Sequence, residues 1–167
     1  TADYGGGMHN YNDSSPTLTG CTFTGNTAYS GGGGMHNNYY SSPTLTGCTF
    51  TDNTAGYDGG GMYNTGSSPT LTNCTFENNT ADDAGGGMSN GDGSSPTLTG
   101  CIFENNTADD AGGGMRNYYS SPTLTDCTFE NNTGGNLGGG IWNSNSSSPT
   151  LTDCTFTGNT ANYTGGG

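Results

Sequence analysis

The sequence has almost no positive charge. Lysine is absent and Arg116 is the one basic residue, set against 14 acidic residues, so the net charge is −13. Nucleic-acid binding needs Lys and Arg to neutralise phosphates, and anionic membrane surfaces attract the same side chains. We therefore expect no nucleic-acid partner and no attraction to anionic membranes.

Hydrophobic residues are also scarce. They make up 27% of the chain, and no apolar run approaches the roughly 20 residues of a membrane span. We therefore expect no membrane insertion by this segment. With 33 glycines, such a composition is typical of disorder unless repeated units share one core.

The chain is built from a repeat of 26 or 27 residues. The block GGGM…SSPTLTxCTFxxNTA occurs six times, in units of about 5–31, 32–58, 59–84, 85–111, 112–137 and 138–164. A period in this range is typical of a solenoid whose units stack on their neighbours. We therefore treat 1–167 as a single β-solenoid repeat domain, and because it begins and ends inside a unit, we expect a segment of a longer chain or filament.

Each unit carries short alternating segments. Thr17-Leu18-Thr19 and Cys21-Thr22-Phe23 alternate polar and apolar residues, and the Met8 segment supplies a third extended stretch. Pro, Gly, Thr and Asn in every unit disfavour helix. The pattern predicts an all-β parallel β-helix of about six coils with three short strands per coil.

The bends are also legible in the sequence. The residue between the first two strands is always one that tolerates left-handed backbone: Gly20, Gly47, Asn73, Gly100, Asp126 and Asp153. A second corner is expected at 25–28 and its equivalents. The third, from Met to Pro, varies between seven and eight residues and is therefore a surface loop.

Alternation places Leu18, Cys21, Phe23, Ala28, Met8 and their equivalents inside the solenoid. The aromatic column is Phe23, Phe50, Phe76, Phe103, Phe129 and Phe156. The thiol column is Cys21, Cys48, Cys74, Cys101, Cys127 and Cys154. Stacked parallel strands suit disulfide torsions poorly, so we expect buried free thiols, with disulfides as the alternative.

Two asparagine columns never vary between units. One is Asn26, Asn53, Asn79, Asn106, Asn132 and Asn159; the other is Asn10, Asn37, Asn64, Asn90, Asn117 and Asn143. Ligand binding is one interpretation. The other, which we favour, is an amide ladder in which each side chain bonds to the next and satisfies polar groups at a bend.

The phrases FTGN, FTDN and FENN, alternating with GGGM or GGGI, resemble the FxxN and GGA[ILV] repeats of chlamydial polymorphic outer-membrane proteins. The longer phrase SPTLTNCTFENNTA is similar to right-handed parallel β-helix repeat proteins of environmental bacteria. The resemblance covers the whole chain. It implies a right-handed coil, an extracellular or cell-surface location, and a scaffold or adhesive role.

Catalysis finds little support in the residues. Enzymes that resemble pectate lyase on this fold need a basic residue and calcium-holding carboxylates. Here lysine is absent, and Arg116 occupies a position that holds His, Tyr, Ser or Trp in the other units. His9 and His36 stack in adjacent coils, with no carboxylate tied to them. We expect no enzymatic activity.

The acidic residues offer a weak calcium candidate. Asp82 and Asp83 should stack on Asp109 and Asp110, where a cation could relieve their repulsion. A solvated acidic face is the simpler interpretation, and no other cofactor is expected.

Threonine forms an outward grid of two columns, which resembles the Thr-x-Thr face of ice-binding solenoids. Its members are Thr17, Thr19, Thr44, Thr46, Thr70, Thr72, Thr97, Thr99, Thr123, Thr125, Thr150 and Thr152. Ice or glycan binding is therefore an alternative function. Threonine also simply suits exposed strand positions.

Sugar attachment is a further possibility, because glycosylation sequons occur at Asn12, Asn78, Asn105, Asn131, Asn145 and Asn162. Tyrosines at the variable loop could make lateral contacts or grip glycans. The main expectation is a non-catalytic structural repeat protein, forming an extracellular filament or a cell-surface or adhesin stalk. Its expected partner is itself, head to tail, or adjoining repeats of a longer chain, with surface glycans as an alternative.

Overall fold

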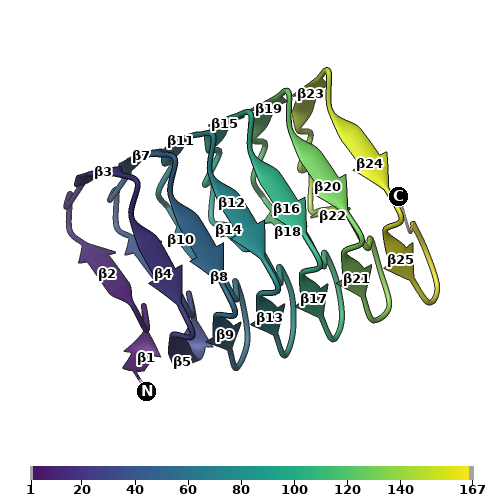
Figure 1. Ribbon diagram of the computed structural model, residues 1–167, viewed down its shortest axis with the longest axis horizontal. Coiled ribbons are helices and arrows are strands. Elements are labelled where there is room, and N and C mark those ends of the chain that lie inside the picture. The colour runs from purple at the N-terminus through teal and green to yellow at the C-terminus, as the bar shows by residue number, and fades with distance from the viewer. Residues whose placement is uncertain (1, 166–167) are drawn as a thin grey trace.

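The computed structural model describes residues 2–165; Thr1, Gly166 and Gly167 of the predicted domain lie outside the described residues. The chain winds into a rod of stacked coils with its ends at opposite ends of the rod (Figure 1). Four parallel sheets run along the rod, one with seven strands and three with six. We call them sheets A to D.

The strands of each sheet recur once per coil. Sheet A contains β1 (Ala2–Tyr4), β5 (Thr27–Gly31), β9 (Thr54–Ala55), β13 (Thr80–Ala81), β17 (Thr107–Ala108), β21 (Thr133–Gly134) and β25 (Thr160–Ala161). Sheet B contains β2 (Met8–Tyr11), β6 (Met35–Asn38), β10 (Met62–Thr65), β14 (Met88–Gly91), β18 (Met115–Tyr118) and β22 (Ile141–Ser144). Sheet C contains β3 (Thr17–Thr19), β7 (Thr44–Thr46), β11 (Thr70–Thr72), β15 (Thr97–Thr99), β19 (Thr123–Thr125) and β23 (Thr150–Thr152). Sheet D contains β4 (Thr22–Thr24), β8 (Thr49–Thr51), β12 (Thr75–Glu77), β16 (Ile102–Glu104), β20 (Thr128–Glu130) and β24 (Thr155–Thr157).

The prediction of three strands per coil is wrong, because the two residues after each asparagine of the Asn26 column form a fourth strand and are not part of a corner. This pair is Thr-Ala in five coils and Thr133-Gly134 in the other. The turn is completed one residue before the asparagine, where Gly25, Asn78 and their equivalents have φ between 53° and 65°. Thr54-Ala55 can then pair in parallel with Thr80-Ala81 while alanine faces the core. Two residues are too few for alternation to reveal such a strand in the sequence.

The other predicted bends are confirmed. The residue between sheets C and D has φ between 52° and 62° in all six coils, whether it is Gly, Asn or Asp. Each eight-residue Met-to-Pro turn has two residues at positive φ, such as Asn12 and Asp13. Each seven-residue turn has one, Gly66 or Tyr119. The extra residue is therefore absorbed within the turn and the strand register is kept.

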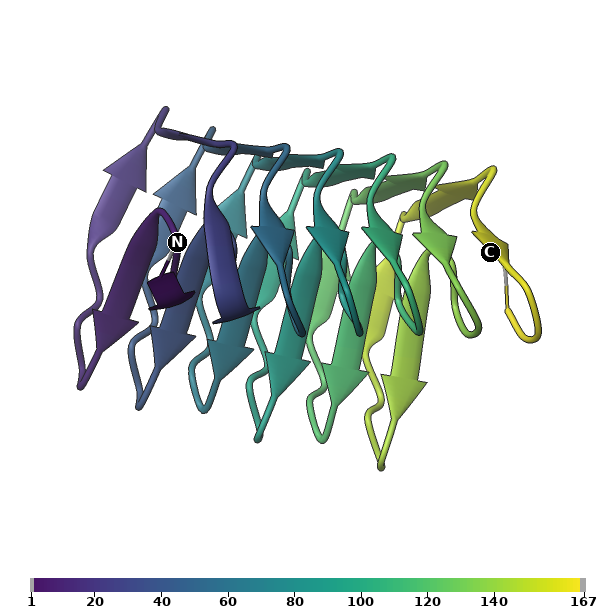
Figure 2. The ribbon, with the colours of Figure 1, turned by 90° about the horizontal axis from the view of Figure 1, so that it is seen from below.

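Figure 2 shows the coils stacked along the rod. Columns of like side chains fill the interior of the coils and form the core. Adjacent phenylalanine rings stack face to face, with centroids 4.7–5.0 Å apart and planes within 5°. Phe103 and Leu98 in the middle of the rod are fully buried, whereas Phe156 and Leu151 in the last coil are 36% and 41% exposed. Each coil is therefore buried by the one that follows it.

The glycine triplet is required by close packing of the backbone. A Cβ on Gly86 would collide with the carbonyl oxygens of Thr107 and Gly113, and one on Gly87 would lie 2.8 Å from a ring carbon of Phe103. Since backbone and a buried ring cannot give way, alanine is excluded at both positions. Because the triplet has no side chains, the backbone before each strand of sheet B can pack directly against sheet A and against the phenylalanine column.

Candidate functional site

The two invariant asparagine columns form amide ladders, which confirms that interpretation. Along each column, Nδ2 donates to the Oδ1 of the next asparagine at 2.8–2.9 Å. At the sheet D to sheet A corner, Asn79 Nδ2 also donates to Phe50 O at 2.9 Å, while Asn79 Oδ1 accepts from Asn53 N. These amides have their hydrogen-bonding groups engaged inside the rod, so they are structural in this fold.

The six cysteines are free thiols that line the core in one column. Each Sγ lies 3.4–3.6 Å from the carbonyl oxygen of the threonine two residues earlier. Burial raises the pKa of the Cys48 thiol, and hydrogen bonding to Cys127 and Cys74 together with burial raises the pKa of the Cys101 thiol. The same hydrogen bonds with Cys101 lower the pKa of Cys74 and of Cys127 to about 7. Both side chains are buried, so a reagent in solution does not reach them.

The threonine grid lies on the outer face of sheet C. Strand pairs are in register, so Thr70 lies beside Thr97 and Thr72 beside Thr99. The intervening leucines point inward, and the threonines are exposed or half-exposed along the whole sheet. The coil rise is visible in the 4.7 Å spacing of stacked Phe76 and Phe103 rings. The grid is therefore regular in both directions.

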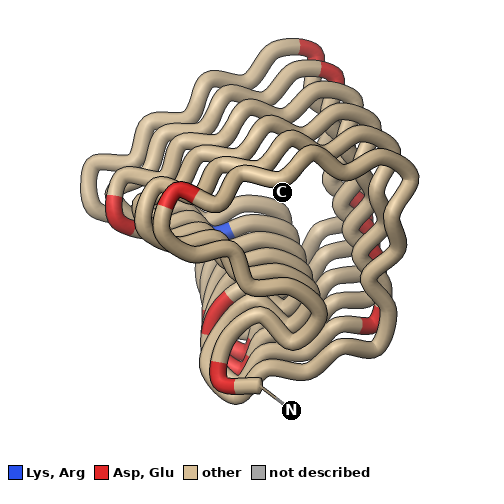
Figure 3. The backbone as a smooth tube through the Cα atoms, turned by 90° about the vertical axis from the view of Figure 1, so that its left-hand side faces the viewer, with Lys and Arg blue, Asp and Glu red and all other residues tan. Residues whose placement is uncertain are grey.

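The outer face of sheet B carries a column that does not repeat one residue type: His9, His36, Tyr63, Ser89, Arg116 and Trp142. Arg116 reaches across two coils to Asp58, with Nη1 3.0 Å from Oδ2, and passes Ser89 Oγ at 3.3 Å. The small side chains of Ala84 and Ser89 leave room for this reach. Arg116 is the one blue segment among the red acidic ones in Figure 3.

Not every buried polar atom of the Asp58–Arg116 ion pair is hydrogen-bonded within residues 2–165. Burial raises the pKa of Asp58 to about 6, although Arg116 lowers it, and Asp83 adds to the rise. Within the described residues, Asp58 Oδ1 and Arg116 Nε have no hydrogen-bond partner. A cavity of about 300 Å³ beside them is lined by Tyr4, Ser30, Tyr57, Asp58, Tyr63 and Asp83.

The two histidines stack as predicted, with His9 and His36 ring centroids 4.9 Å apart. Tyr4 and Tyr63 also stack on His36, at 4.8 and 5.1 Å. His36 is only 2% exposed, and burial, then His9, lowers its pKa to about 4. A buried neutral imidazole without hydrogen-bond partners in residues 2–165 is a packing element in this geometry.

The four aspartates proposed for calcium lie on the turns that follow sheet A. Asp110 N donates to Asp83 O, and Asp110 Oδ1 accepts from Asn136 Nδ2 at 2.7 Å. Over the part of the chain that the structure describes, no three His, Cys, Asp or Glu side chains gather as a metal site would require. The calcium candidate gains no support from this geometry.

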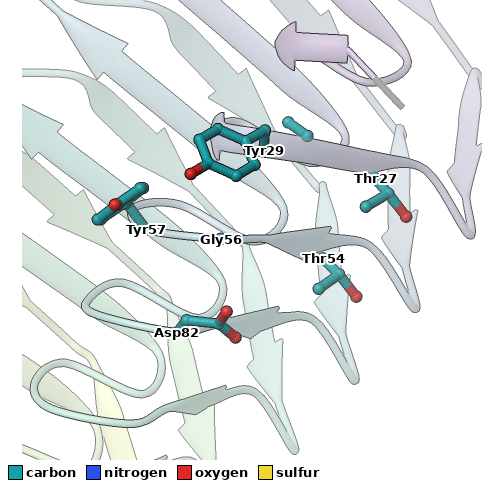
Figure 4. A pocket seen from close by; sticks show the side chains of 7 residues that line it. Thr27, Tyr29, Thr54, Gly56, Tyr57 and Asp82 are labelled. Atoms are coloured by element: carbon teal, nitrogen blue, oxygen red, sulfur yellow. The ribbon is translucent and has the colours of Figure 1, made fainter.

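A surface cavity of about 400 Å³ lies on the outer side of sheet A (Figure 4). Thr27 and Thr54 lie at one end, and Tyr29, Tyr57 and Asp82 at the other, with Gly56 between. The two tyrosine rings meet edge to face with centroids 6.2 Å apart. This is an open, mixed aromatic and polar surface.

The predicted sequons are at exposed turns. Asn78, Asn105 and Asn131 occupy the same left-handed corner position, with φ of 53–54°. Asn12 and Asn145 are exposed in Met-to-Pro turns, and Asn162 is exposed after β25, where its Nδ2 donates to Gly135 O. All six side chains are therefore accessible to a modifying enzyme.

The model of the right-handed β-helix region family matches residues 2–161, and the chain belongs to this family. No curated protein and no solved structure matches the chain. Residues 2–165 contain no helix with the length and apolarity needed to cross a membrane.

Sequence reasoning missed the Asp58–Arg116 pair and the cavities. Two residues 58 positions apart give no sequence signal of their contact. The available clue was that the residue after each Met or Ile varies in type between units, whereas the residues on either side of it repeat.

Proposed function

We propose that the chain is a non-catalytic structural rod, a segment of an extracellular filament or of a cell-surface or adhesin stalk. The observation that carries the proposal is the unbroken repetition of every bonding column. Asparagine, phenylalanine and the paired backbone of one coil recur in the next without change of register. Such a ladder can be extended coil by coil at constant geometry, which suits a rigid spacer.

The last coil has an open surface on which a further coil could stack. Ile141, Asn143, Leu151 and Phe156 line an open hollow there, and among residues 2–165 the strands of this coil pair with the preceding coil only. Unpaired parallel strands template further strands. A further coil would cover this surface, whether it comes from a longer chain or from a second copy stacked head to tail.

The surface location rests on the resemblance to chlamydial and environmental bacterial repeats and on the exposed sequons. We assign the rod no catalytic role, because its one basic side chain is held by Asp58 and the imidazole of His36 is buried. Activity on polyuronates would overturn that assignment.

Electron microscopy of the native material, combined with the chain mass under denaturing conditions, tests the proposal. Thin filaments far longer than the mass allows would establish head-to-tail stacking. Rods whose length matches the chain mass would support a covalent stalk and rule out the polymer. Particles with no elongated shape would contradict the structural role.

A second function is favoured by the threonine grid on sheet C, which is regular, exposed and backed by a rigid leucine column. Such a face could order water or contact glycans. Thermal hysteresis should then be measurable and be abolished by Thr97→Lys, whereas Thr107→Lys on sheet A should leave it intact. A wild-type chain without hysteresis would refute ice binding.

A further inference from the structure

The Met-to-Pro turn of the second coil has an unusual backbone for its residues. Tyr39 and Tyr40 have φ of 51° and 63°, the places that Asn12 and Asp13 hold in the first coil with φ of 54° and 60°. Left-handed backbone disfavours bulky side chains, whereas Asn and Asp tolerate it. The rings are 54% and 77% exposed, so packing does not explain why tyrosine stands there.

The turn of the third coil leaves a notch beside these tyrosines. It is one residue shorter than the turns of the second and fourth coils, and at its tip Gly66 has no atom within 4 Å of where a Cβ would lie. The resulting cavity of about 300 Å³ is lined by Asn38, Tyr39, Tyr40, Thr65, Gly66 and Asp92. This volume is at the lower end of the range for small-ligand sites.

The lining combines flat apolar faces with fixed polar groups. Asn38 Oδ1 accepts from Tyr39 N at 2.7 Å, which orients the amide and leaves its Nδ2 hydrogens for a ligand. Tyr11 packs edge-on against Tyr39, with centroids 5.0 Å apart, and so limits the movement of that ring. The Asp92 carboxylate and the tyrosine and threonine hydroxyls can exchange hydrogen bonds with ligand hydroxyl groups.

This chemistry matches one residue of a sugar. The C–H face of a pyranose ring lies flat on an aromatic face, while its hydroxyl groups pair with amide and carboxylate groups. A uronate would bring its own carboxylate to a site that already holds Asp92, so repulsion of like charges disfavours it.

We propose that the notch between the second and fourth Met-to-Pro turns binds a neutral hexopyranose residue of a glycan, with Tyr39 and Tyr40 as the stacking surface. The site is separate from the threonine grid and does not depend on the rod forming a filament. Tyr119 occupies the place of Gly66 in the fifth coil, so the fifth coil has no glycine opening at the tip of its turn.

The whole chain is titrated with the methyl glycosides of glucose, galactose and mannose while tyrosine ring resonances are followed by NMR. We expect saturable shifts with at least one of the three, at millimolar concentration. The double variant Tyr39→Asn/Tyr40→Asp, which copies the first coil, should weaken binding at least tenfold and melt no lower than the wild type.

The variant Tyr163→Asn is the control, since it removes an exposed tyrosine that lies outside the notch; its affinity should stay within twofold of the wild type. The proposal is overturned if none of the three glycosides shifts the tyrosine resonances or if the double variant binds as the wild type does. Equally tight binding of methyl glucuronide would overturn the choice of a neutral sugar.

Discussion

Replacing Asn79 by alanine should remove one of the side chains of the corner ladder that make four hydrogen bonds each. Its Nδ2 donates to Phe50 O and Asn106 Oδ1, both at 2.9 Å, and its Oδ1 accepts from Asn53 N at 3.1 Å and Asn53 Nδ2 at 2.9 Å. The residue is fully buried, so these partners are out of reach of bulk water in the wild-type rod. Four hydrogen bonds at about 1 kcal/mol each predict a loss of about 4 kcal/mol in the free energy of unfolding.

Asn26→Ala is the matched control, because in the first coil the side chain makes one such bond, from Nδ2 to Asn53 Oδ1 at 2.9 Å. We expect a loss of about 1 kcal/mol there. Since domains are stable by only about 5–15 kcal/mol, the two variants should be easy to separate by urea denaturation.

Solenoid units couple mainly to their neighbours, so amide hydrogen exchange should accompany the denaturation curves. Protection should fall first at Asn53, Thr80 and Asn106, around the deleted side chain. Losses that agree within about 0.5 kcal/mol for the two variants would refute the argument from hydrogen-bond number.

Three further predictions concern the core and the Asp58–Arg116 ion pair. His36→Tyr should remove the acid sensitivity due to this residue. The pKa of His36 is about 4 in the folded state and 6.5 in the unfolded state, so the wild type loses about 3 kcal/mol of its free energy of unfolding as the pH falls from 6.5 to 4. Urea titrations of both chains across that range check it, since the difference between them isolates His36. Arg116→Met should lower the free energy of unfolding by about 3 kcal/mol at pH 8, because it leaves Asp58 charged and unpaired. Adding Asp58→Ala should recover most of this loss. A double variant no more stable than the single one would contradict the pairing. Phe103→Ala should cost about 3–5 kcal/mol and Phe156→Ala about 1 kcal/mol, because Phe156 is already 36% exposed; equal shifts in midpoint would argue against a stack buried coil by coil.

The variable positions cluster on particular parts of the rod. The column from His9 to Trp142, the turns after sheet A and the Met-to-Pro turns change from coil to coil, while the ladders and the core repeat. The repeated positions maintain the rod, and the variable ones distinguish one coil from another.

The sequence by itself determined the repeat, the parallel stacking and the inward columns. It also determined the corner between sheets C and D, because Gly, Asn or Asp stands there in every coil and these residues tolerate left-handed backbone. These features depend on local geometry repeated at a fixed period, and local geometry is what a single chain reveals.

The tertiary structure alone decided three other features. Thr54-Ala55 became a strand because an earlier turn freed it to pair with its neighbours in the stack. Arg116 pairs with Asp58 because the side chains of Ala84 and Ser89, which lie between the two residues, are small. The notch at Gly66 exists because a shorter turn lies between two longer ones. Each depends on what the adjacent coils contain, and contacts between coils are set by stacking, which local patterns do not specify.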